Sequence, residues 1–540
     1  MTAPSRTGAG ALSLRKDNGR PFRRILIANR GEIAVRIIRT CRDLGVETVA
    51  VYSDADIDAL HVRSAEVAVR LGAAPAGESY LRADAIIEAA LATGAEAVHP
   101  GYGFLSERAA FARAVTDAGL VFVGPSADAI EALGDKLAAR RTAQAAGVPV
   151  VPGTFQAVPV DRPDDVVAVI AAAEQIGFPL LVKASAGGGG RGMRLVSKAS
   201  DLPAALAAGS TEAAAAFGDG AVYLEREIRP ARHIEVQLLG DNEGTIVALG
   251  ERDCSIQRRH QKLVEESPAP GLTADERAEL HDLATRAARS AGLHNAATAE
   301  FLFDAERRLW FLEVNARLQV EHGVTELVTD LDLVGEQLWI AAGSPLSEGV
   351  LAAAATAAEP RRHAIEVRLA AEDPSRAFAP SPGRVGAWQM PAGPDVRVDT
   401  AIRAGERVPP DYDPMIAKIM TVGPDRATAI DRMRRALDEV VVTGIQTTLP
   451  FDRALMRDPA FAAADLSTDW VAERWDGEAD RASALIAAAQ LAAGAGVADR
   501  AASVPPAASG PVESASLRKD SDGSAWRTAG RAAATDRWPR

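Results

Sequence analysis

The stretch that decides the fold runs Glu300-Phe-Leu-Phe-Asp-Ala-Glu-Arg-Arg-Leu-Trp-Phe-Leu-Glu313-Val-Asn-Ala-Arg-Leu-Gln-Val-Glu321-His-Gly-Val-Thr-Glu326. Two aromatic-rich runs flank a short charged link, a pattern that predicts two antiparallel strands and a turn. Folding the stretch about Glu306 brings Glu300 close to opposite Glu313. Because like charges directly across a strand pair destabilise it, facing carboxylates indicate a cation between them, and oxygen ligands favour Mg²⁺ or Mn²⁺. The alternative is a solvated strand edge with ordinary surface charge.

The alternation of polar and apolar residues continues beyond this hairpin. On an extended backbone, every second side chain points to the same face. If the backbone is extended here, one face carries a row of five polar side chains, namely Glu313, Asn315, Arg317, Gln319 and Glu321.

The composition is that of a globular protein with several domains. The chain has 540 residues, 47% hydrophobic and 25% charged, which suggests roughly three or four domains. A net charge of −13 without a long basic stripe argues against a nucleic-acid partner. Cys41 and Cys254 lie far apart in sequence, which excludes a disulfide framework and fits a reducing cytoplasm. Residues 1–20 lack the apolar core of a secretory signal, and no run approaches the roughly 20 apolar residues that span a membrane.

The first ordered segment predicts a parallel sheet. An apolar strand over residues 24–27 leads through Asn29-Arg-Gly31 into a helix with apolar residues at helical spacing, and a second strand covers 47–52. A further strand ends in the glycine-punctuated turn His99-Pro-Gly-Tyr-Gly-Phe-Leu-Ser-Glu107. Turns at the carboxyl ends of parallel strands commonly bind ligands, although this pattern also fits a simple loop.

A glycine-rich segment follows a predicted strand over residues 178–183. Glycines let backbone N–H groups converge on an anion, and Lys183 and Arg191 add positive charge for a polyphosphate. The lysine precedes the glycines, so the segment is not a Walker A loop. We predict a lid that covers phosphates rather than a flexible linker, because strand-like residues flank the segment on both sides. Its four consecutive glycines are Gly187, Gly188, Gly189 and Gly190.

Two more strands and a charged segment lead toward the central hairpin. Residues 221–225 and 232–238 have the composition and alternation of strands. Residues 251–266 carry charges of both signs and predict a loop. His260 and Lys262 share parity within it, so the loop is either simply solvated or a cluster of donors for an anion.

Five long motifs occur in order along the chain: Ala28-Asn-Arg-Gly-Glu-Ile-Ala, His99-Pro-Gly-Tyr-Gly-Phe-Leu-Ser-Glu, Lys183-Ala-Ser-Ala-Gly-Gly-Gly-Gly-Arg-Gly-Met, Glu251-Arg-Asp-Cys-Ser-Ile-Gln-Arg-Arg-His-Gln-Lys and Glu313-Val-Asn-Ala-Arg-Leu-Gln-Val-Glu-His. Together they resemble the biotin carboxylase family of ATP-grasp enzymes over residues 22–472. The resemblance implies that the protein uses MgATP and bicarbonate to carboxylate biotin on a carrier protein or domain. The reaction would pass through carboxyphosphate and would be the first half-reaction of an acyl-CoA carboxylase. The family also includes the carboxylase components of pyruvate and urea carboxylases.

The resemblance further implies a multidomain fold that combines α/β and α+β parts around an ATP-grasp core. The expected segments are a disordered tail at 1–21, a doubly wound parallel-sheet domain at 22–135, an ATP-grasp domain at 136–350 with its lid at about 150–228, a β-rich C-terminal domain at 360–472, and a helical then disordered tail at 476–540.

Roles follow residue by residue from the same resemblance. The ATP-contacting groups are Lys136, Lys183, the glycines 187–190, Glu225, His233 and His260. The metal ligands are Glu300 and Glu313, with Asn315 beside them. Bicarbonate is held by Lys262, Arg317, Gln319 and Val320, and Glu321 is the general base. Tyr102 lines the biotin site, where Arg368 stabilises the enolate oxygen of biotin.

Partners are expected from the same resemblance. No Met-Lys-Met biotinylation motif occurs, so the biotin carrier is either a separate chain or lies in a longer polypeptide. A homodimer or larger complex and a carboxyltransferase subunit are also expected, without nucleic acid or membrane. Gly323 and Val367 stand where many family members have Pro and Cys, and neither departure removes a charged catalytic group.

Two rival hypotheses remain at this point. Another ATP-grasp ligase would activate a different carboxylate or an amine. A catalytically idle scaffold would lack at least one of the charged residues of the site, and all five are present: Lys183, Glu300, Glu313, Glu321 and Arg368.

Overall fold

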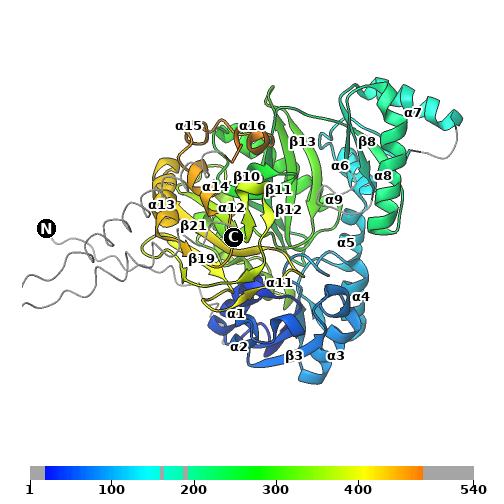
Figure 1. Cartoon of the computed structure of the whole chain (residues 1–540). Helices are drawn as coiled ribbons and strands as arrows, with labels where there is room; N and C mark the ends of the chain where they lie inside the picture. Colours follow the sequence, from blue (N-terminus) through cyan, green and yellow to red (C-terminus); the bar gives the residue numbers. More distant parts are fainter. Residues whose placement is uncertain (1–18, 159–162, 186–192, 478–540) are drawn as a thin grey trace, which may run out of the picture.

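The computed structural model describes residues 19–158, 163–185 and 193–477. Its N-terminal part is a parallel sheet in the order β3-β2-β1-β4-β5, at the bottom of Figure 1. The predicted strand-helix-strand unit is confirmed, and helix α1 (Gly31–Asp43) follows the first strand. The strand order reverses between β1 and β4, so the loops that leave both strands open at one edge, the usual place for a ligand. The strands are β1 (Arg24–Ile27), β2 (Glu47–Ser53), β3 (Val67–Gly72), β4 (Ala97–His99) and β5 (Val121–Phe122).

An eight-stranded antiparallel sheet forms the body of the molecule, in the order β13-β12-β9-β10-β11-β14-β21-β19. The predicted central hairpin is confirmed as its edge pair, with Glu300 in register with Glu313. The strands are β9 (Ala231–Gly240), β10 (Ile246–Arg258), β11 (Gln261–Ser267), β12 (Asn295–Asp304), β13 (Leu309–Asn315), β14 (His363–Ala370), β19 (Val396–Thr400) and β21 (Met415–Gly423).

The predicted loop over residues 251–266 is wrong, because this segment forms most of strands β10 and β11. Most of its acidic and basic side chains are buried in the sheet and paired there, whereas Arg259 and His260 are exposed in the turn between the two strands. Arg252, which is fully buried, donates to Glu235 at 2.5 Å, and Asp253 accepts from Arg232 at 2.6 Å. A highly charged segment can lie in a protein interior when each charge meets an opposite one.

The C-terminal region contributes three strands to this large sheet. Strands β14, β21 and β19 continue it beyond β11, and the register places Lys418 opposite Arg368. Short pairs of strands and several helices complete the region. The remaining strands here are β15 (Glu372–Asp373), β16 (Ala379–Pro380), β17 (Gly383–Arg384), β18 (Trp388–Gln389), β20 (Arg407–Val408) and β22 (Val441–Val442).

A smaller unit stands off to one side of the body, where the lid was predicted (Figure 1). Its sheet, in the order β7-β6-β8, has its own apolar core, which includes Val182 and Leu224. Two helices, α7 (Pro163–Ile176) and α8 (Leu202–Phe217), accompany the strands β6 (Leu180–Ala184), β7 (Arg194–Val196) and β8 (Val222–Arg226). The four glycines and Arg191 lie outside the described residues, as do the tails at 1–18 and 478–540.

The other helices surround the two large sheets. Within the described residues, no helix has both the length and the apolar character needed to cross a bilayer. These helices are α2 (Leu60–Ser64), α3 (Ala83–Thr93), α4 (Ala109–Asp117), α5 (Ala127–Gly134), α6 (Lys136–Ala145), α9 (Ala274–Ser290), α10 (His322–Thr329), α11 (Leu333–Ala341), α12 (Glu348–Ala355), α13 (Arg426–Glu439), α14 (Leu449–Leu455), α15 (Pro459–Ala462) and α16 (Trp470–Arg474).

Candidate active site

A cavity of about 1460 Å³ lies between the N-terminal sheet, the large sheet and the lid. The structure brings every described residue of the predicted site to its wall, although these residues come from distant parts of the chain. They are Tyr102, Lys136, Lys183, Glu225, His233, His260, Lys262, Glu300, Glu313, Asn315, Arg317, Gln319, Val320, Glu321 and Arg368.

One row of side chains crosses four neighbouring strands and begins at the wall of this cleft, with Glu313 and Glu300. In register, Glu313 faces Glu300, Glu300 faces Glu235, and Glu235 faces Arg252. Directly opposite residues of an antiparallel pair share a face, so three carboxylates stand side by side. Such a row needs positive charge, and Lys262 supplies part of it.

Lys262 lies among three carboxylates and makes a close contact with each. Its Nζ donates to Glu235 at 2.5 Å, to Glu321 at 2.7 Å and to Glu300 at 3.0 Å. Burial alone would lower the pKa of Lys262, but these carboxylates raise it well above its usual range. The ammonium therefore stays charged at neutral pH and holds the groups in place.

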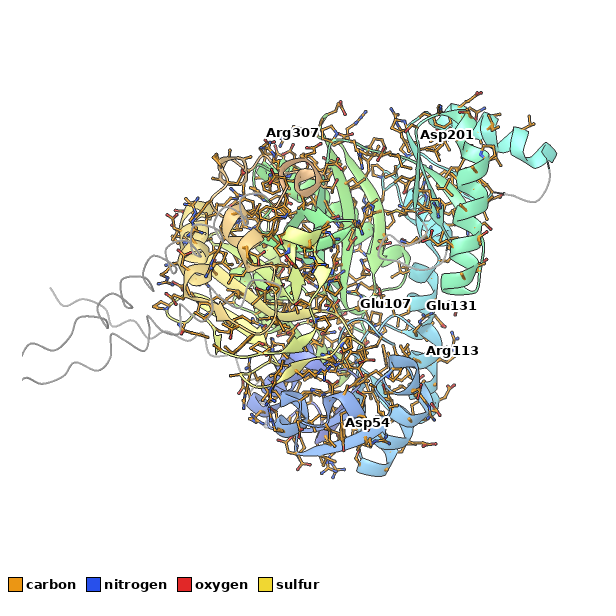
Figure 2. The ribbon with its side chains drawn as sticks, viewed as in Figure 1. Asp54, Glu107, Arg113, Glu131, Asp201 and Arg307 are labelled. Atoms are coloured by element: carbon orange, nitrogen blue, oxygen red, sulfur yellow. The ribbon has the colours of Figure 1, made fainter. Side chains whose placement is uncertain are left out.

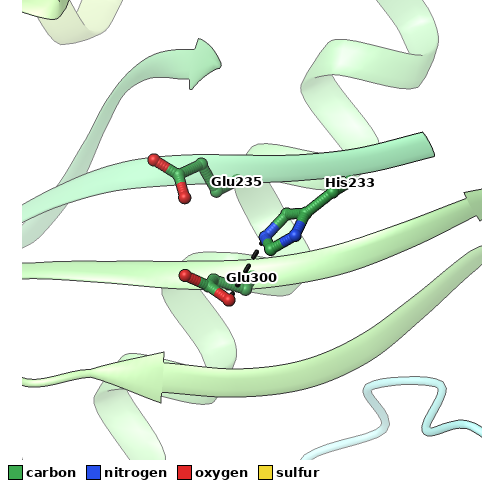
Figure 3. Close-up of side chains that lie close together, drawn as sticks. All are labelled: His233, Glu235 and Glu300. Atoms are coloured by element: carbon green, nitrogen blue, oxygen red, sulfur yellow. Dashed lines mark ion pairs between the residues drawn. The ribbon is translucent and has the colours of Figure 1, made fainter. Parts of the chain in front are cut away.

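Two sets of side chains in this row offer ligand atoms for a cation. The first is His233, Glu235 and Glu300, whose ligand atoms lie within 4.8 Å of one another (Figure 3). His233 Nδ1 accepts from Gln257 at 2.8 Å, which leaves the proton on Nε2, 3.2 Å from Glu300. Because Nε2 carries the proton and Nδ1 accepts from Gln257, His233 offers no free ring nitrogen, and this set is poorly suited to bind an ion.

The second set, predicted from the sequence, has the oxygen donors that Mg²⁺ and Mn²⁺ prefer. Glu300 and Glu313 face each other, and Asn315 donates to Glu300 at 2.9 Å. Lys136 contacts Glu313 and Lys262 contacts Glu300, so positive charge already gathers where a divalent ion would lie. Burial alone would raise the pKa of Glu300, but Lys262 and His233 hold it far below its usual range. The donor set thus fits the predicted cation.

Glu321 lies fully buried between two cations at the end of the cleft. Lys262 reaches one of its oxygens at 2.7 Å, and Arg368 reaches the other at 2.8 Å. Burial alone would raise the pKa of Glu321, but Lys262, Arg368 and Arg252 lower it well below its usual range. The group is consequently a carboxylate at neutral pH, aimed into a site that would also attract a small anion.

The polar row beyond Glu313 converges in a way that the sequence did not predict. Strand β13 ends at Asn315, so the extended backbone on which the row of five polar side chains depended does not continue to Glu321. Residues 316–321 turn away from the edge of the sheet. The polar side chains are brought together by the guanidinium of Arg317 and not by the alternation of an extended strand. Arg317 donates to Gln319 at 2.7 Å and to Asn315 at 3.3 Å.

Arg317 also joins the two large parts of the molecule. Its Nε donates to Glu107 at 2.8 Å. Figure 2 shows Glu107 where the N-terminal part meets the large sheet. The turn that carries Tyr102 therefore lies beside the loop at 316–321, as the predicted biotin and bicarbonate roles require.

The lid side of the cleft carries its own charge cluster. Glu225 accepts from the fully buried Arg140 at 2.5 Å and from Lys183. His260 lies in the tight turn between β10 and β11, with a positive φ of 65°. Partial desolvation of its ring and nearby cations, Lys183 first among them, lower the pKa of His260. Lys183 of the lid and His260 of the large sheet thus both line the cleft.

Sequence reasoning missed several charged residues of the site. Glu235 and Arg252 complete the row of charges, and Glu265 accepts from Arg368 Nε at 2.6 Å. A signal for Glu235 was present, because His233, Glu235 and Gln237 alternate along β9. Glu265 gave no such signal, since the mixed charges of its segment predict a loop.

Three family models match successive parts of the chain. "Biotin carboxylase, N-terminal domain" matches residues 21–130. "Carbamoyl-phosphate synthase L chain, ATP binding domain" matches residues 135–349. "Biotin carboxylase C-terminal domain" matches residues 366–473. The three matches together cover the N-terminal sheet, the lid and the large sheet.

Relatives with different names share this part of the chain. The biotin carboxylase of Nostoc sp. is 47% identical over 456 residues, which covers 84% of this chain and 99% of that protein. A pyruvate carboxylase subunit from Methanothermobacter thermautotrophicus is 45% identical and covers 84% of this chain and 90% of that protein. The propionyl-CoA carboxylase alpha chain of Ruegeria pomeroyi is also 45% identical and covers 84% of this chain and 68% of that protein.

A solved structure has the same fold. The biotin carboxylase domain dimer of 2-oxoglutarate carboxylase from Hydrogenobacter thermophilus superposes with a TM-score of 0.79 at 42% identity. The match covers 84% of this chain and 97% of that chain. That structure is a complex with MgADP, ADP and bicarbonate.

Proposed function

The chain belongs to the biotin carboxylase family, and we propose that it is the component that carboxylates biotin on a carrier protein or domain, using ATP and bicarbonate. The observation that carries the proposal is the setting of Glu321. One carboxylate is buried between the ammonium of Lys262 and the guanidinium of Arg368, in a cleft that also holds the predicted nucleotide-binding lysines.

The nucleotide lies, in this proposal, between the lid and the large sheet. Lys183 and Lys136 direct ammonium groups at its phosphates, and both now neutralise carboxylates, Glu225 and Glu313. Glu300, Glu313 and Asn315 would hold Mg²⁺ or Mn²⁺. When bound, this ion supplies the positive charge that neutralises the β- and γ-phosphates during phosphoryl transfer.

Bicarbonate lies between Lys262 and Arg317, because an ammonium and a guanidinium together hold a small anion. Glu321 accepts its proton, and an oxygen of bicarbonate attacks the γ-phosphorus as the bond to the β-phosphate oxygen breaks. The products are ADP and carboxyphosphate. Lys262 and Arg368 keep Glu321 ionised, so that it has a free lone pair for this proton, and their contacts hold its two oxygens in place.

Biotin enters beside Tyr102 and Arg368. Carboxyphosphate decomposes to CO₂ and phosphate, the phosphate removes the proton from biotin N1, and N1 forms the new bond to CO₂. Arg368 stabilises the negative charge that develops on the biotin oxygen. Its contacts with Glu321 and Glu265 hold the guanidinium at the wall of the cleft for this purpose.

The acceptor of the carboxyl group is proposed to be an acyl-CoA. The similarity to a propionyl-CoA carboxylase alpha chain supports this role, and the similarity to a pyruvate carboxylase component supports the alternative that a pyruvate or urea carboxylase type system receives the group. A biotin carrier, a homodimer or larger complex and a carboxyltransferase subunit are part of the proposal, as is a cytoplasmic location.

Bicarbonate-dependent ATP hydrolysis by the full-length chain tests the proposal. We expect hydrolysis to require Mg²⁺ or Mn²⁺, to rise when free biotin is added, and to yield carboxybiotin from labelled bicarbonate. Hydrolysis that depends on another carboxylate or on an amine, and is indifferent to biotin, would favour a different ATP-grasp ligase. The acceptor is identified separately, by isolating the native complex and assaying it with acetyl-CoA, propionyl-CoA, pyruvate and urea.

A further inference from the structure

Lys418 lies on strand β21, and its side chain is fully buried. The register places it opposite Arg368 on one side and opposite Asp399 on the other. Resemblance assigns no role to this lysine, and it does not line the cleft. A buried ammonium is expensive to desolvate, so its partners explain why it is there.

The ammonium of Lys418 contacts two parts of the chain that lie at the cleft, the loop at 316–321 and the N-terminal part. Its Nζ donates to the backbone oxygen of Val320 at 2.6 Å and lies 3.4 Å from Oε1 of Glu32. The same oxygen of Glu32 accepts the hydroxyl proton of Tyr102. Val320 belongs to the loop at 316–321, whereas Tyr102 belongs to the N-terminal part.

The charges around Lys418 keep its ammonium protonated at neutral pH. Burial alone would lower the pKa of Lys418, but Glu32, Glu366 and Asp399 raise it, against the opposing charge of Arg397. Burial raises the pKa of Glu32 to about 7, while Lys418 acts to lower it. Oε2 of Glu32 has no hydrogen-bond partner among the described residues, so this carboxylate is aligned through Oε1 alone.

We propose that Lys418 is a positioning residue that couples the bicarbonate-binding loop to Tyr102, so that the bicarbonate and biotin sites form together. The inference rests on the proposed function and adds a residue that touches neither substrate. Residues 316–321 leave the sheet edge, and the bond from Lys418 to Val320 O anchors the loop directly before Glu321. A displacement of about 1 Å at such a loop is enough to lower a rate by about 100-fold.

The Lys418→Met variant tests the inference, because methionine fills a similar volume without the charge. We expect the KM for bicarbonate to rise about tenfold and the stimulation of ATP hydrolysis by biotin to fall about tenfold, with the KM for MgATP changed less than about twofold. A purely structural lysine would lower the melting temperature without this selective effect on KM.

Two substitutions at Glu32 separate its charge from its hydrogen bonds. Glu32→Gln keeps an oxygen that accepts from both Tyr102 and Lys418, so it should retain near wild-type kinetics. Glu32→Ala removes that oxygen and should reproduce the effects of Lys418→Met. If Lys418→Met fails to fold, the difference between Glu32→Gln and Glu32→Ala tests the inference in its place. Equal kinetics for both would overturn the inference.

Arg397→Met serves as a matched control from the neighbouring strand. Arg397 pairs with Glu326 and Asp399 but contacts neither Val320 nor Glu32. This variant should lose stability and keep the wild-type KM for bicarbonate. The same kinetic change in Arg397→Met would show that disturbance of the sheet, rather than the bond to Val320, is responsible, and the inference would fall.

Hydrogen–deuterium exchange provides a readout that does not depend on the reaction. In Lys418→Met, backbone amides of residues 316–321 should exchange faster, while those in the lid strands keep the wild-type rate. Unchanged exchange at 316–321 would overturn the inference even if the enzyme were active. A wild-type chain without bicarbonate-dependent hydrolysis would instead refute the proposed function, and the exchange result would still decide whether Lys418 holds the loop.

Discussion

Glu300 and Glu313 lie directly opposite each other on strands β12 and β13, and each is in contact with its own lysine. Lys262 lies 3.0 Å from Glu300, and Lys136 contacts Glu313. Two like charges across a strand pair repel each other, and the two lysines offset this repulsion. In the proposed function, the same pair of carboxylates would hold the divalent cation.

Glu313→Gln should weaken the metal dependence of the reaction, because the variant removes one negative charge from the donor set. We expect the Mg²⁺ concentration for half-maximal ATP hydrolysis to rise by about 10- to 100-fold, measured by titration at fixed ATP. Glu306→Gln in the turn of the same hairpin is the control, because Glu306 is exposed and pairs only with Arg308 among the described residues. An unchanged Mg²⁺ requirement in Glu313→Gln would remove its role as a ligand.

Glu321→Gln should abolish most of the activity while it preserves the size of the side chain. The amide cannot accept the proton of bicarbonate, so the rate of bicarbonate-dependent hydrolysis should fall by about 10²- to 10⁴-fold. Nucleotide binding, measured by calorimetry, should stay within about twofold of the wild type, since Lys136 and Lys183 are untouched. A fully active variant would contradict the role of Glu321 as the general base.

Lys183→Met should weaken nucleotide binding specifically. In this variant, Glu225 would still be paired with Arg140 at 2.5 Å, so its negative charge would stay neutralised. Loss of a charged hydrogen bond to phosphate should raise the KM for ATP by about 10- to 100-fold. Lys198→Met is a matched control in the lid, because the side chain of Lys198 is 71% exposed and lies 3.9 Å from Asp201. An equal effect in both variants would contradict a direct contact between Lys183 and ATP.

The stability of the large sheet should depend on pH through Glu266. Burial alone would raise the pKa of Glu266, but His363 and Arg426 lower it to about 2 from its ordinary value of 4.5. Because the folded protein binds this proton less tightly than the unfolded chain, Glu266 stabilises the fold above pH 4.5 and loses this effect as the pH falls towards 2.

This shift corresponds to about 3 kcal/mol of unfolding free energy at neutral pH. Urea unfolding of Glu266→Gln should show a loss of that order at pH 7 and a weaker pH dependence between pH 2 and 4.5 than the wild type. Glu279→Gln, on the exposed side of α9, should behave as the wild type. A Glu266→Gln curve parallel to the wild type across this range would show that the ion pairs do not set the acid limb.

Much of the site could be predicted from local pattern. The hairpin around Glu306 sets the register as far as Phe301 and Phe311, because two strands joined by a short turn have little freedom of register. The approach of Glu300 to Glu313 and the first strand-helix-strand unit therefore followed from sequence, whereas a bulge between Glu300 and Phe301 makes the two carboxylates directly opposite. The row of polar side chains does not continue as a strand beyond Asn315, because alternation alone does not show where an edge strand ends.

Buried charge was the main source of error. Residues 251–266 resemble a solvated loop because each charge is judged alone, whereas in the fold Arg252 meets Glu235 and Arg232 meets Asp253. These partners lie on another strand, and a single sequence does not show which strands become neighbours. For the same reason, Lys418 gave no signal until Val320 and Glu32 were found beside it.

The sequence by itself determined the local elements and the chemical types of the site residues, since short-range spacing sets strand, turn and register, and long motifs identify the family. The tertiary structure decided which of these residues share a cleft, how each buried charge is balanced, and that the C-terminal strands continue the sheet of the ATP-binding part. The physical reason is that the energy of a buried charge depends on partners far away in the chain, such as Arg368 for Glu321, and only the folded arrangement brings them within hydrogen-bond distance.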